Sequence, residues 1–325
     1  MRLRRCKFKA PAAYAAGVFI FMFARRHPYL FFLLTLIAVV SVSVIFLSYL
    51  LVRGLETTQF SEYVTEPGGG KVGVVEISGI ITDAGETIQQ LKHFREDESI
   101  KAIVLRVESP GGVVGPSQEI YREVRKTIPA KKVIASMGSV AASGGYYVAA
   151  AADGIIANPG TITGSIGVIM GYTNFEKLLD KIGLVPVVIK SGEYKDMGSP
   201  TRKMTLKEEE ALQYFVDQTH KQFVKAIAEG RDMDLALVES LADGRIYTGE
   251  EAVKNGLVDR LGNLEDAIEW AGRLGGIEGK ISSVYKREET FSFLRYLSES
   301  AIKELILRTA GQGLQGGYIY RPGME

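Results

Sequence analysis

The sequence predicts an α/β domain with a mostly parallel sheet, which follows a single transmembrane helix. Two features of the 325 residues lead to this fold class. Residues 30–52 form an apolar run without a charged side chain, and from residue 71 onward segments with strand and helix patterns alternate. Alternating βα units place strands in parallel and cover the faces of the sheet with helices. The 46% hydrophobic and 24% charged residues are ordinary for a globular protein.

The apolar run 30–52 is long enough to cross a bilayer, because a helix rises about 1.5 Å per residue and the hydrocarbon core is about 30 Å thick. A cleaved signal peptide would end in a small-residue site, and the following stretch, YLLVRGLETT, offers none. We therefore expect an uncleaved transmembrane anchor, followed by a linker over residues 53–70 that ends in EPGGG.

The charges predict the orientation of this anchor. Seven basic residues and no acidic one occur in residues 1–26. The positive-inside rule then holds residues 1–29 in the cytoplasm or at the membrane interface, where the short apolar stretch Pro11–Phe23 would lie. The expected location is the cell (inner) membrane, with one span and everything after the anchor outside the cytoplasm.

The composition of the exported part excludes several function classes. With the basic N-terminus set aside, acidic residues outnumber basic ones, which is a poor footprint for binding nucleic acid. The one cysteine, Cys6, falls on the cytoplasmic side. The exported part therefore has neither a disulfide nor a thiol nucleophile.

Proline, glycine and helix-capping residues indicate where the expected helices and strands begin and end. Pro110 ends a strand, Pro116 opens a helix, and Gly183 ends one. The stretch TLKE at residue 205 fits a capping box at the start of a long helix. The expected strands are 71–81, 101–109, 131–137 and 185–192, with short ones in 154–159 and 166–171, and the expected helices are 86–97, 115–128, 143–152, 174–183 and 205–229. These elements form one domain over residues 71–280, and residues 281–325 are expected to hold an amphipathic helix (290–308) and a flexible tail.

Gly111 and Gly112 lie where a strand runs into a helix, in VESPGGVVGPS. An ordinary βα turn explains them, and the motifs for phosphate or dinucleotide binding are absent. The functional alternative is an oxyanion hole, in which backbone N–H groups meet a developing negative charge.

Ser143 precedes two glycines and a helical run in GSVAASGGYYVAAAA. Serine is among the preferred helix N-caps, and capping is the common reason for a serine at this place. The alternative is a nucleophile whose developing oxyanion meets neighbouring amides.

A serine nucleophile needs a base, and the three histidines are poor candidates. His27 falls on the wrong side of the membrane, and His93 and His220 lie in charged helical surroundings. A Ser-Lys pair remains, in which burial must lower the pKa of the lysine by several units. Lys195 stands out because it follows an apolar strand pattern in the glycine-bounded loop KSGEYKDMGSP. An ion pair with Glu193 or Asp196 is the competing interpretation, and it would raise that pKa instead.

Thr163 and Ser165 lie in the glycine-bounded stretch PGTITGSIGVIMG. Turn formation explains small hydroxyl residues there. The functional alternative is a hydroxyl that orients the neutral lysine by hydrogen bonding.

Several of these stretches together resemble the short form of bacterial signal peptide peptidase A, also called protease IV. The matching segments are SPGGVV, GSVAASGGYY, GTITGSIGVI, SGEYKDMGSP and GRIYTGEEAVKNGLVDRLG, and they cover about residues 70–275 in order and spacing. The resemblance implies a ClpP/crotonase-like spiral of βα units and a membrane-anchored serine endopeptidase that degrades remnant signal peptides. It implies no metal, no cofactor and no ATP.

The resemblance also implies roles for single residues. Ser143 would be the nucleophile, Lys195 the general base and Ser165 the residue that orients Lys195. The amides of Gly112 and Gly144 would form the oxyanion hole. The family further implies a ring-like homo-oligomer in which Ser143 and Lys195 meet across a subunit boundary.

Two other functions remain open at this point. An acyl-CoA hydratase or isomerase of the same fold would use carboxylate bases and bind a nucleotide, which the extracytoplasmic location disfavours. A non-catalytic scaffold of a membrane assembly would keep the fold without a lysine poised opposite a serine.

Overall fold

The computed structural model describes residues 25–56, 62–64, 69–286 and 315–319. They belong to two compact units, one within residues 1–60 and one within residues 61–325. The expected interfacial stretch 11–23 and the expected amphipathic helix 290–308 lie outside the described residues.

The first unit contains one long helix, α2 (Pro28–Glu56), which begins with a proline at a position where its missing N–H costs no hydrogen bond. The stretch Pro28–Phe46 is long and apolar enough to cross a membrane, with a mean hydropathy of 2.6. The helical state of the expected anchor is therefore confirmed, while its insertion in a bilayer stays a prediction.

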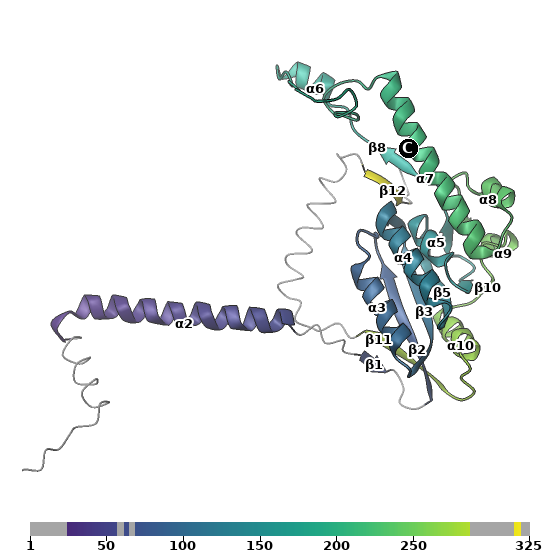
Figure 1. Ribbon diagram of the computed structural model, residues 1–325, viewed down its shortest axis with the longest axis horizontal. Coiled ribbons are helices and arrows are strands. Elements are labelled where there is room, and N and C mark those ends of the chain that lie inside the picture. The colour runs from purple at the N-terminus through teal and green to yellow at the C-terminus, as the bar shows by residue number, and fades with distance from the viewer. Residues whose placement is uncertain (1–24, 57–61, 65–68, 287–314, 320–325) are drawn as a thin grey trace, which may run out of the picture. The chain divides into compact units, whose positions relative to one another are not determined.

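The second unit is built on one mixed but mainly parallel sheet (Figure 1). The strands lie in the order β1-β11-β2-β3-β5-β6-β10, and every neighbouring pair in this order except β1 with β11 is parallel. This confirms the expected fold class. The strands in this order are β1 (Glu62–Val64), β11 (Ile281–Lys286), β2 (Gly70–Ser78), β3 (Ile100–Ser109), β5 (Lys132–Ala142), β6 (Gly154–Ala157) and β10 (Arg260–Leu261).

Helices cover both faces of this sheet. On β3 the side chains alternate: Ile103, Leu105 and Val107 belong to one buried cluster, and Ala102 and Val104 to another. The first cluster packs under α3 (Gly85–Glu96), α4 (Val114–Thr127), α5 (Gly144–Ala149) and the second half of α7 (Leu206–Arg231), and the second packs under α10 (Leu264–Leu274). The remaining helices are α6 (Glu176–Lys181), α8 (Leu235–Leu241) and α9 (Gly249–Lys254).

Strand β5 continues beyond its partner β6 and gains a new neighbour at its carboxyl end. There β7 (Ile162–Gly164) pairs in parallel with Val140–Ala142, and β9 (Ile246–Thr248) pairs antiparallel with β7. The residues that follow β5 and β7 therefore start from adjacent, parallel strand ends, because Ala142 lies opposite Gly164.

A second, small sheet contains β4 (Gly111–Val113), β12 (Gln315–Ile319) and β8 (Ile169–Gly171), with β12 in the middle. Two expectations for residues 281–325 change here. Residues 281–286 form β11 of the main sheet, and residues 315–319 of the expected flexible tail form a paired strand. Backbone pairing with β4 and β8 orders a segment whose composition alone indicates flexibility.

The expected strand over residues 185–192 is wrong. The chain there has no regular secondary structure, and Ile189 is 97% exposed while Val185 and Val187 are each 83% exposed. The apolar pattern has no neighbouring strand within the described residues of this chain to pair with. The expected helix over 205–229 is confirmed as α7, and Thr205 and Glu208 form the capping box.

Candidate active site

Ser143 occupies the sharp turn between β5 and α5. Its backbone has a φ of 53° and a ψ of −117°, a sparsely populated conformation for a residue with a Cβ. Its amide donates to the carbonyl of Gly164 at 2.8 Å, and its hydroxyl makes no capping bond to α5. The capping explanation for this serine is therefore not realised. A serine on a strained strand-to-helix turn is instead the arrangement that nucleophilic serines have in enzymes of the α/β-hydrolase fold.

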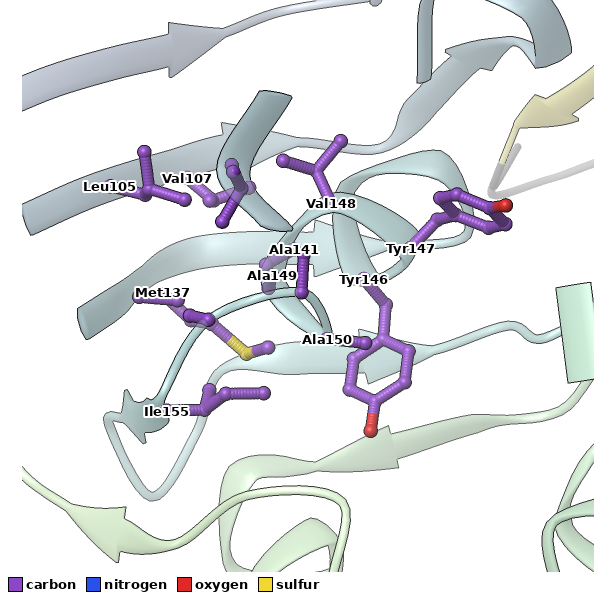
Figure 2. Packing of buried hydrophobic residues seen from close by; sticks show 14 of the residues in the cluster. Leu105, Val107, Met137, Ala141, Tyr146, Tyr147, Val148, Ala149, Ala150 and Ile155 are labelled. Atoms are coloured by element: carbon purple, nitrogen blue, oxygen red, sulfur yellow. The ribbon is translucent and has the colours of Figure 1, made fainter. Parts of the chain in front are cut away.

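The short helix α5 is held rigidly in the core beneath Ser143. All six of its residues are buried, and Figure 2 shows Tyr146, Tyr147 and Val148 among side chains from β3, β5 and β6. The Tyr146 hydroxyl donates to the carbonyl of Leu257 at 3.0 Å. Burial raises the pKa of Tyr146 far above its ordinary value and that of Tyr147 to about 12, so both rings stay neutral. Rigid packing of α5 fixes the position of Ser143.

Gly112 and Gly144 lie against one another. A methyl group on Gly144 would lie 3.0 Å from the Gly112 nitrogen and 2.8 Å from Ser117 Oγ, so only glycine allows this close approach. Gly144 opens α5, and an amide at that position has no acceptor within the helix. The structure thus brings together the two glycines that are expected to be oxyanion donors, and one of them, Gly144, directly follows Ser143 in the chain.

Ser165 mirrors Ser143 at the end of the neighbouring strand. It follows β7 as Ser143 follows β5, its φ is 49°, and it is buried. Its amide donates to the carbonyl of Arg245 at 2.8 Å. Among the non-glycine residues of the described chain, only Ser143, Ser165 and Asp232 have a positive φ. Two of these three are residues that the sequence proposes for the site.

Lys195 lies elsewhere, in an exposed loop after α6. Within the described residues, its ammonium group makes no hydrogen bond or ion pair, and no hydrogen bond joins it to Ser143. Figure 1 shows α6, which precedes this loop, well away from α5. One chain therefore brings Ser143, Ser165 and the two glycines together, but not Lys195. The strand that the sequence predicts directly before Lys195, over residues 185–192, is not formed either, so it does not hold Lys195 against the sheet.

The acidic neighbours of Lys195 pair with other cations. Asp196 accepts from Lys190 Nζ at 2.6 Å and from Arg202 Nε at 2.9 Å, and Glu193 lies 3.9 Å from Lys207 Nζ. The ion pairs with Glu193 or Asp196 that compete for Lys195 are thus not formed. Hydrogen bonds from Arg202 and Lys190 hold the pKa of Asp196 well below its usual value.

Arg202 is a residue that the sequence argument missed. Its Nε bonds Asp196, and its Nη1 donates to Glu208 Oε2 at 2.9 Å, which ties the loop to the first turn of α7. The Arg202 hydrogen bond and the Thr205 amide lower the pKa of Glu208 to about 2. In the sequence, the only sign of this clamp is that Asp196 and Glu208 each lie six positions from Arg202. Many charged surface residues have such a spacing, so it does not single out these three.

Among the described residues, neither a histidine base nor a group of metal ligands accompanies Ser143. No hydrogen bond joins His93 or His220 to Ser143 in the described part of the chain. His220 is half-buried in α7, with Nε2 shielded from solvent, rather than on a solvated face. Among the same residues, no group of three or more His, Cys, Asp and Glu is placed to hold a metal ion.

Comparison with known proteins places these features in one family. The family model of peptidase family S49 matches residues 126–278, which include Ser143, Ser165 and Lys195, and the Clp protease model matches residues 74–161, which include Gly112. The part of the fold from β2 to β6 is therefore ClpP-like.

Relatives agree with this match. A provisionally named protease of Synechocystis sp. is 44% identical over 210 residues, 64% of this chain and 76% of that protein. A provisionally named signal peptide peptidase SppA of Enterococcus faecium is 40% identical over 232 residues, 66% of this chain and 67% of that protein. The chloroplastic serine protease SPPA of Arabidopsis thaliana is 36% identical over 197 residues, which cover 60% of this chain and 29% of the plant protein.

Proposed function

Because this chain belongs to peptidase family S49 and is a serine peptidase, we propose that it is a membrane-anchored signal peptide peptidase with a Ser143–Lys195 dyad. The observation that carries the proposal is the backbone around Ser143. A strained, buried serine whose hydroxyl caps no helix stands beside two glycine amides in close contact. Helix capping does not explain the strain at Ser143, because its hydroxyl makes no capping bond, whereas a nucleophile beside backbone amide donors accounts for both the strain and the close approach of Gly144 to Gly112.

The reaction assigned to these groups is peptide hydrolysis through an acyl-enzyme. Neutral Lys195 takes the proton of Ser143 Oγ as the oxygen attacks the scissile carbonyl carbon. The amides of Gly112 and Gly144 hold the oxyanion, and the lysine then gives its proton to the leaving nitrogen. Ser165 orients the lysine, and water hydrolyses the ester by the reverse sequence of proton transfers.

The dyad is proposed to form between two chains of a ring-like homo-oligomer. In a single chain Lys195 is exposed, whereas a lysine base needs a dry environment to stay neutral. The segment before it exposes five large apolar side chains within six positions: Leu184, Val185, Val187, Val188 and Ile189. An exposed apolar segment of this size is typical of a protein–protein contact. A second copy that covers it would also bring a foreign Ser143 toward Lys195.

The anchor and the small-residue site favour substrates at the membrane. Helix α2 is long and apolar enough to tether the domain to a bilayer. The residues next to Ser143 in the chain, Ala141, Ala142 and the glycine and tyrosine residues that open α5, are all uncharged and buried. Remnant signal peptides are apolar, extended and left in the membrane, and the peptidase would bind them by strand addition.

The test uses the full chain in detergent micelles with a synthetic peptide that carries the apolar core of a bacterial signal sequence. Wild type should cleave the peptide and should be labelled by a fluorophosphonate at Ser143. Ser143→Ala should lose both, while Ser139→Ala, an exposed serine on the same strand, should retain both.

Three results separate the proposal from its alternatives. Labelling at a serine other than Ser143 would remove the nucleophile assignment. Full turnover by correctly folded Lys195→Ala would remove the base. No peptide cleavage by the assembled wild type, with an intact fold, would favour the scaffold.

A further inference from the structure

Strand β5 loses its regular pairing on both sides shortly before the turn that carries the proposed nucleophile. The register against β3 shifts at Glu108, which stands alone opposite residues 138–140. On the other side, β6 pairs only as far as Met137, and β7 begins to pair at Val140. The backbone between Met137 and Val140 therefore belongs to neither register.

The side chain of Glu108 takes the place of the missing strand partner. Its Oε2 accepts from the amide of Ser139 at 2.8 Å, and its Oε1 accepts from the amide of Val140 at 3.1 Å. The residue before them has to be glycine, because a methyl group on Gly138 would overlap with Glu108 Oε2. The guanidinium of Arg106 lies 3.8 Å from the same oxygen. One carboxylate thus accepts two backbone N–H groups that the strand register leaves over.

Threonine hydroxyls hold carbonyl groups of the same part of β5. Thr161 Oγ1 donates to the carbonyl of Gly138 at 2.7 Å, and Thr163 Oγ1 donates to the carbonyl of Ala141 at 2.7 Å. Both threonines are buried. Met137 and Ala141, at the two ends of this stretch, belong to the buried cluster beneath α5 (Figure 2). Side chains therefore complete the hydrogen bonding that strand pairing leaves open.

We propose that Glu108, together with Thr163, is a positioning residue for the nucleophile: the two side chains fix the path of β5 and thereby the strained turn at Ser143. This inference rests on the proposed function, because it takes Ser143 as the nucleophile. A strained backbone persists only where its surroundings hold it, and Ala141 and Ala142 connect the held stretch directly to Ser143. In the described part of the chain no hydrogen bond joins Glu108 to Ser143, so Glu108 acts through the backbone.

Glu108→Gln separates this role from packing, because glutamine has nearly the same shape. A carboxamide has one acceptor oxygen, and its NH2 group only donates. One of the two backbone amides, at Ser139 or Val140, would then face a donor. We expect the end of β5 to shift and kcat to fall about tenfold or more, since a misplacement of about 1 Å in a reacting group can cost about a hundredfold in rate. KM should keep its wild-type value, because the proposed role concerns the position of Ser143 and not the binding of substrate.

The test uses the full chain in detergent micelles and measures cleavage of the signal-sequence peptide, the rate of fluorophosphonate labelling at Ser143 and the melting temperature. In Glu108→Gln, kcat and the labelling rate should fall by the same factor. Glu250→Gln, which removes only an exposed ion pair with Lys254, should match wild type in both. A Glu108→Gln enzyme with the wild-type kcat and labelling rate, whatever its melting temperature, overturns this inference and leaves the proposed function standing. A wild type that is not labelled at Ser143 overturns both.

A pair of variants at Thr163 decides the question if Glu108→Gln does not fold. Thr163→Val keeps the shape of the side chain but removes the hydroxyl that bonds Ala141, whereas Thr163→Ser keeps that hydroxyl. The labelling rate at Ser143 should fall in Thr163→Val and stay near the wild-type rate in Thr163→Ser. Equal labelling rates in the two variants contradict the proposal.

Discussion

At the scale of single residues, the site consists of two serines at equivalent places on neighbouring strands. Ser143 and Ser165 both follow the last residue of a parallel strand, and the Ser143 amide bonds the carbonyl of the residue before Ser165. Both have a positive φ, which costs about 1–3 kcal/mol at each residue and persists only where the surrounding structure imposes it. Ala142 pairs with Gly164, so the two strained residues start from paired positions at the ends of β5 and β7. The two hydroxyls are therefore positioned by one local feature of the sheet.

The close contact at Gly144 makes a prediction for Gly144→Ala. The new methyl group would meet the Gly112 nitrogen at 3.0 Å and Ser117 Oγ at 2.8 Å, so we expect it to displace one of the two amides that are proposed to hold the oxyanion. Loss of one such donor lowers kcat by about 10²–10³-fold. Peptide turnover and thermal unfolding, measured together, check this.

Gly160→Ala is the matched control for that variant, because a methyl group there meets nothing within 4 Å. It should change neither kcat nor the melting temperature. A Gly144→Ala enzyme with wild-type kcat would show that these amides do not hold the oxyanion.

At the scale of elements, a charged clamp centred on Arg202 ties the loop that carries Lys195 to α7, beside a looser, exposed pair between Glu193 and Lys207. Arg202 bonds Asp196, the residue next to Lys195, and also Glu208 in the first turn of α7. Glu208 is buried and also completes the capping box with Thr205. The clamp thus ties the position of the proposed base to a long helix whose other half packs against α5.

We predict that Arg202→Ala lowers kcat without unfolding the domain. The loop then loses the hydrogen bonds that link Asp196 to Glu208 through Arg202, and a misplacement of about 1 Å in a reacting group can cost about a hundredfold in rate. Lys254→Ala, which breaks only the exposed pair with Glu250, should leave kcat unchanged. Peptide turnover at saturating substrate checks this, and a full-speed Arg202→Ala enzyme would mean that the clamp does not position Lys195.

The same clamp predicts acid sensitivity in one part of the chain. The pKa of Glu208 falls from 4.5 to about 2 on folding, so the unfolded carboxyl binds protons first. Its stabilisation is then complete above pH 4.5 and is lost as the pH falls toward about 2. Hydrogen exchange in residues 190–208, corrected for intrinsic rate, should rise over that window before exchange in β3 and β5 does. Uniform protection of the loop down to pH 2 would contradict this.

The elements that the sequence predicts are those that local patterns determine. The alternation from 71 to 152 and the capping box at Thr205 gave the parallel sheet and α7 in the right places. The strand expected over 185–192 fails because a β pattern needs a neighbour, and this chain supplies none there. The opposite holds for β12, which the sequence does not predict. Its own residues do not show a strand pattern, and its pairing partners, β4 and β8, lie far away in the sequence. Likewise, motif resemblance identifies Ser143 and Lys195, but no pattern in the sequence reveals the strain at Ser165.

At the scale of the whole molecule, a single chain does not bring together all the residues proposed for the site. The proposed nucleophile, its proposed orienting partner and the two glycines proposed as oxyanion donors lie at adjacent strand ends, whereas the proposed base lies in an exposed loop beyond α6. The exposed apolar residues 184–189 adjoin that loop. Burial of this segment by a second copy would remove its solvent exposure and lower the dielectric around Lys195 in one step.

This arrangement predicts that two inactive variants restore one another. The Ser143→Ala variant retains Lys195, and the Lys195→Ala variant retains Ser143. A mixed oligomer of full chains therefore contains some subunit boundaries where an intact Ser143 meets an intact Lys195. Random assembly of equal amounts gives about a quarter of the wild-type site number, because each boundary needs the right chain on both sides. Co-expression with two affinity tags isolates the mixed oligomers for peptide cleavage. Replacing the Lys195→Ala partner by the Ser143→Ala/Lys195→Ala double variant removes every intact serine and should leave no activity. Mixed oligomers that stay inactive, despite each variant folding and assembling, would require that both dyad members come from the same chain.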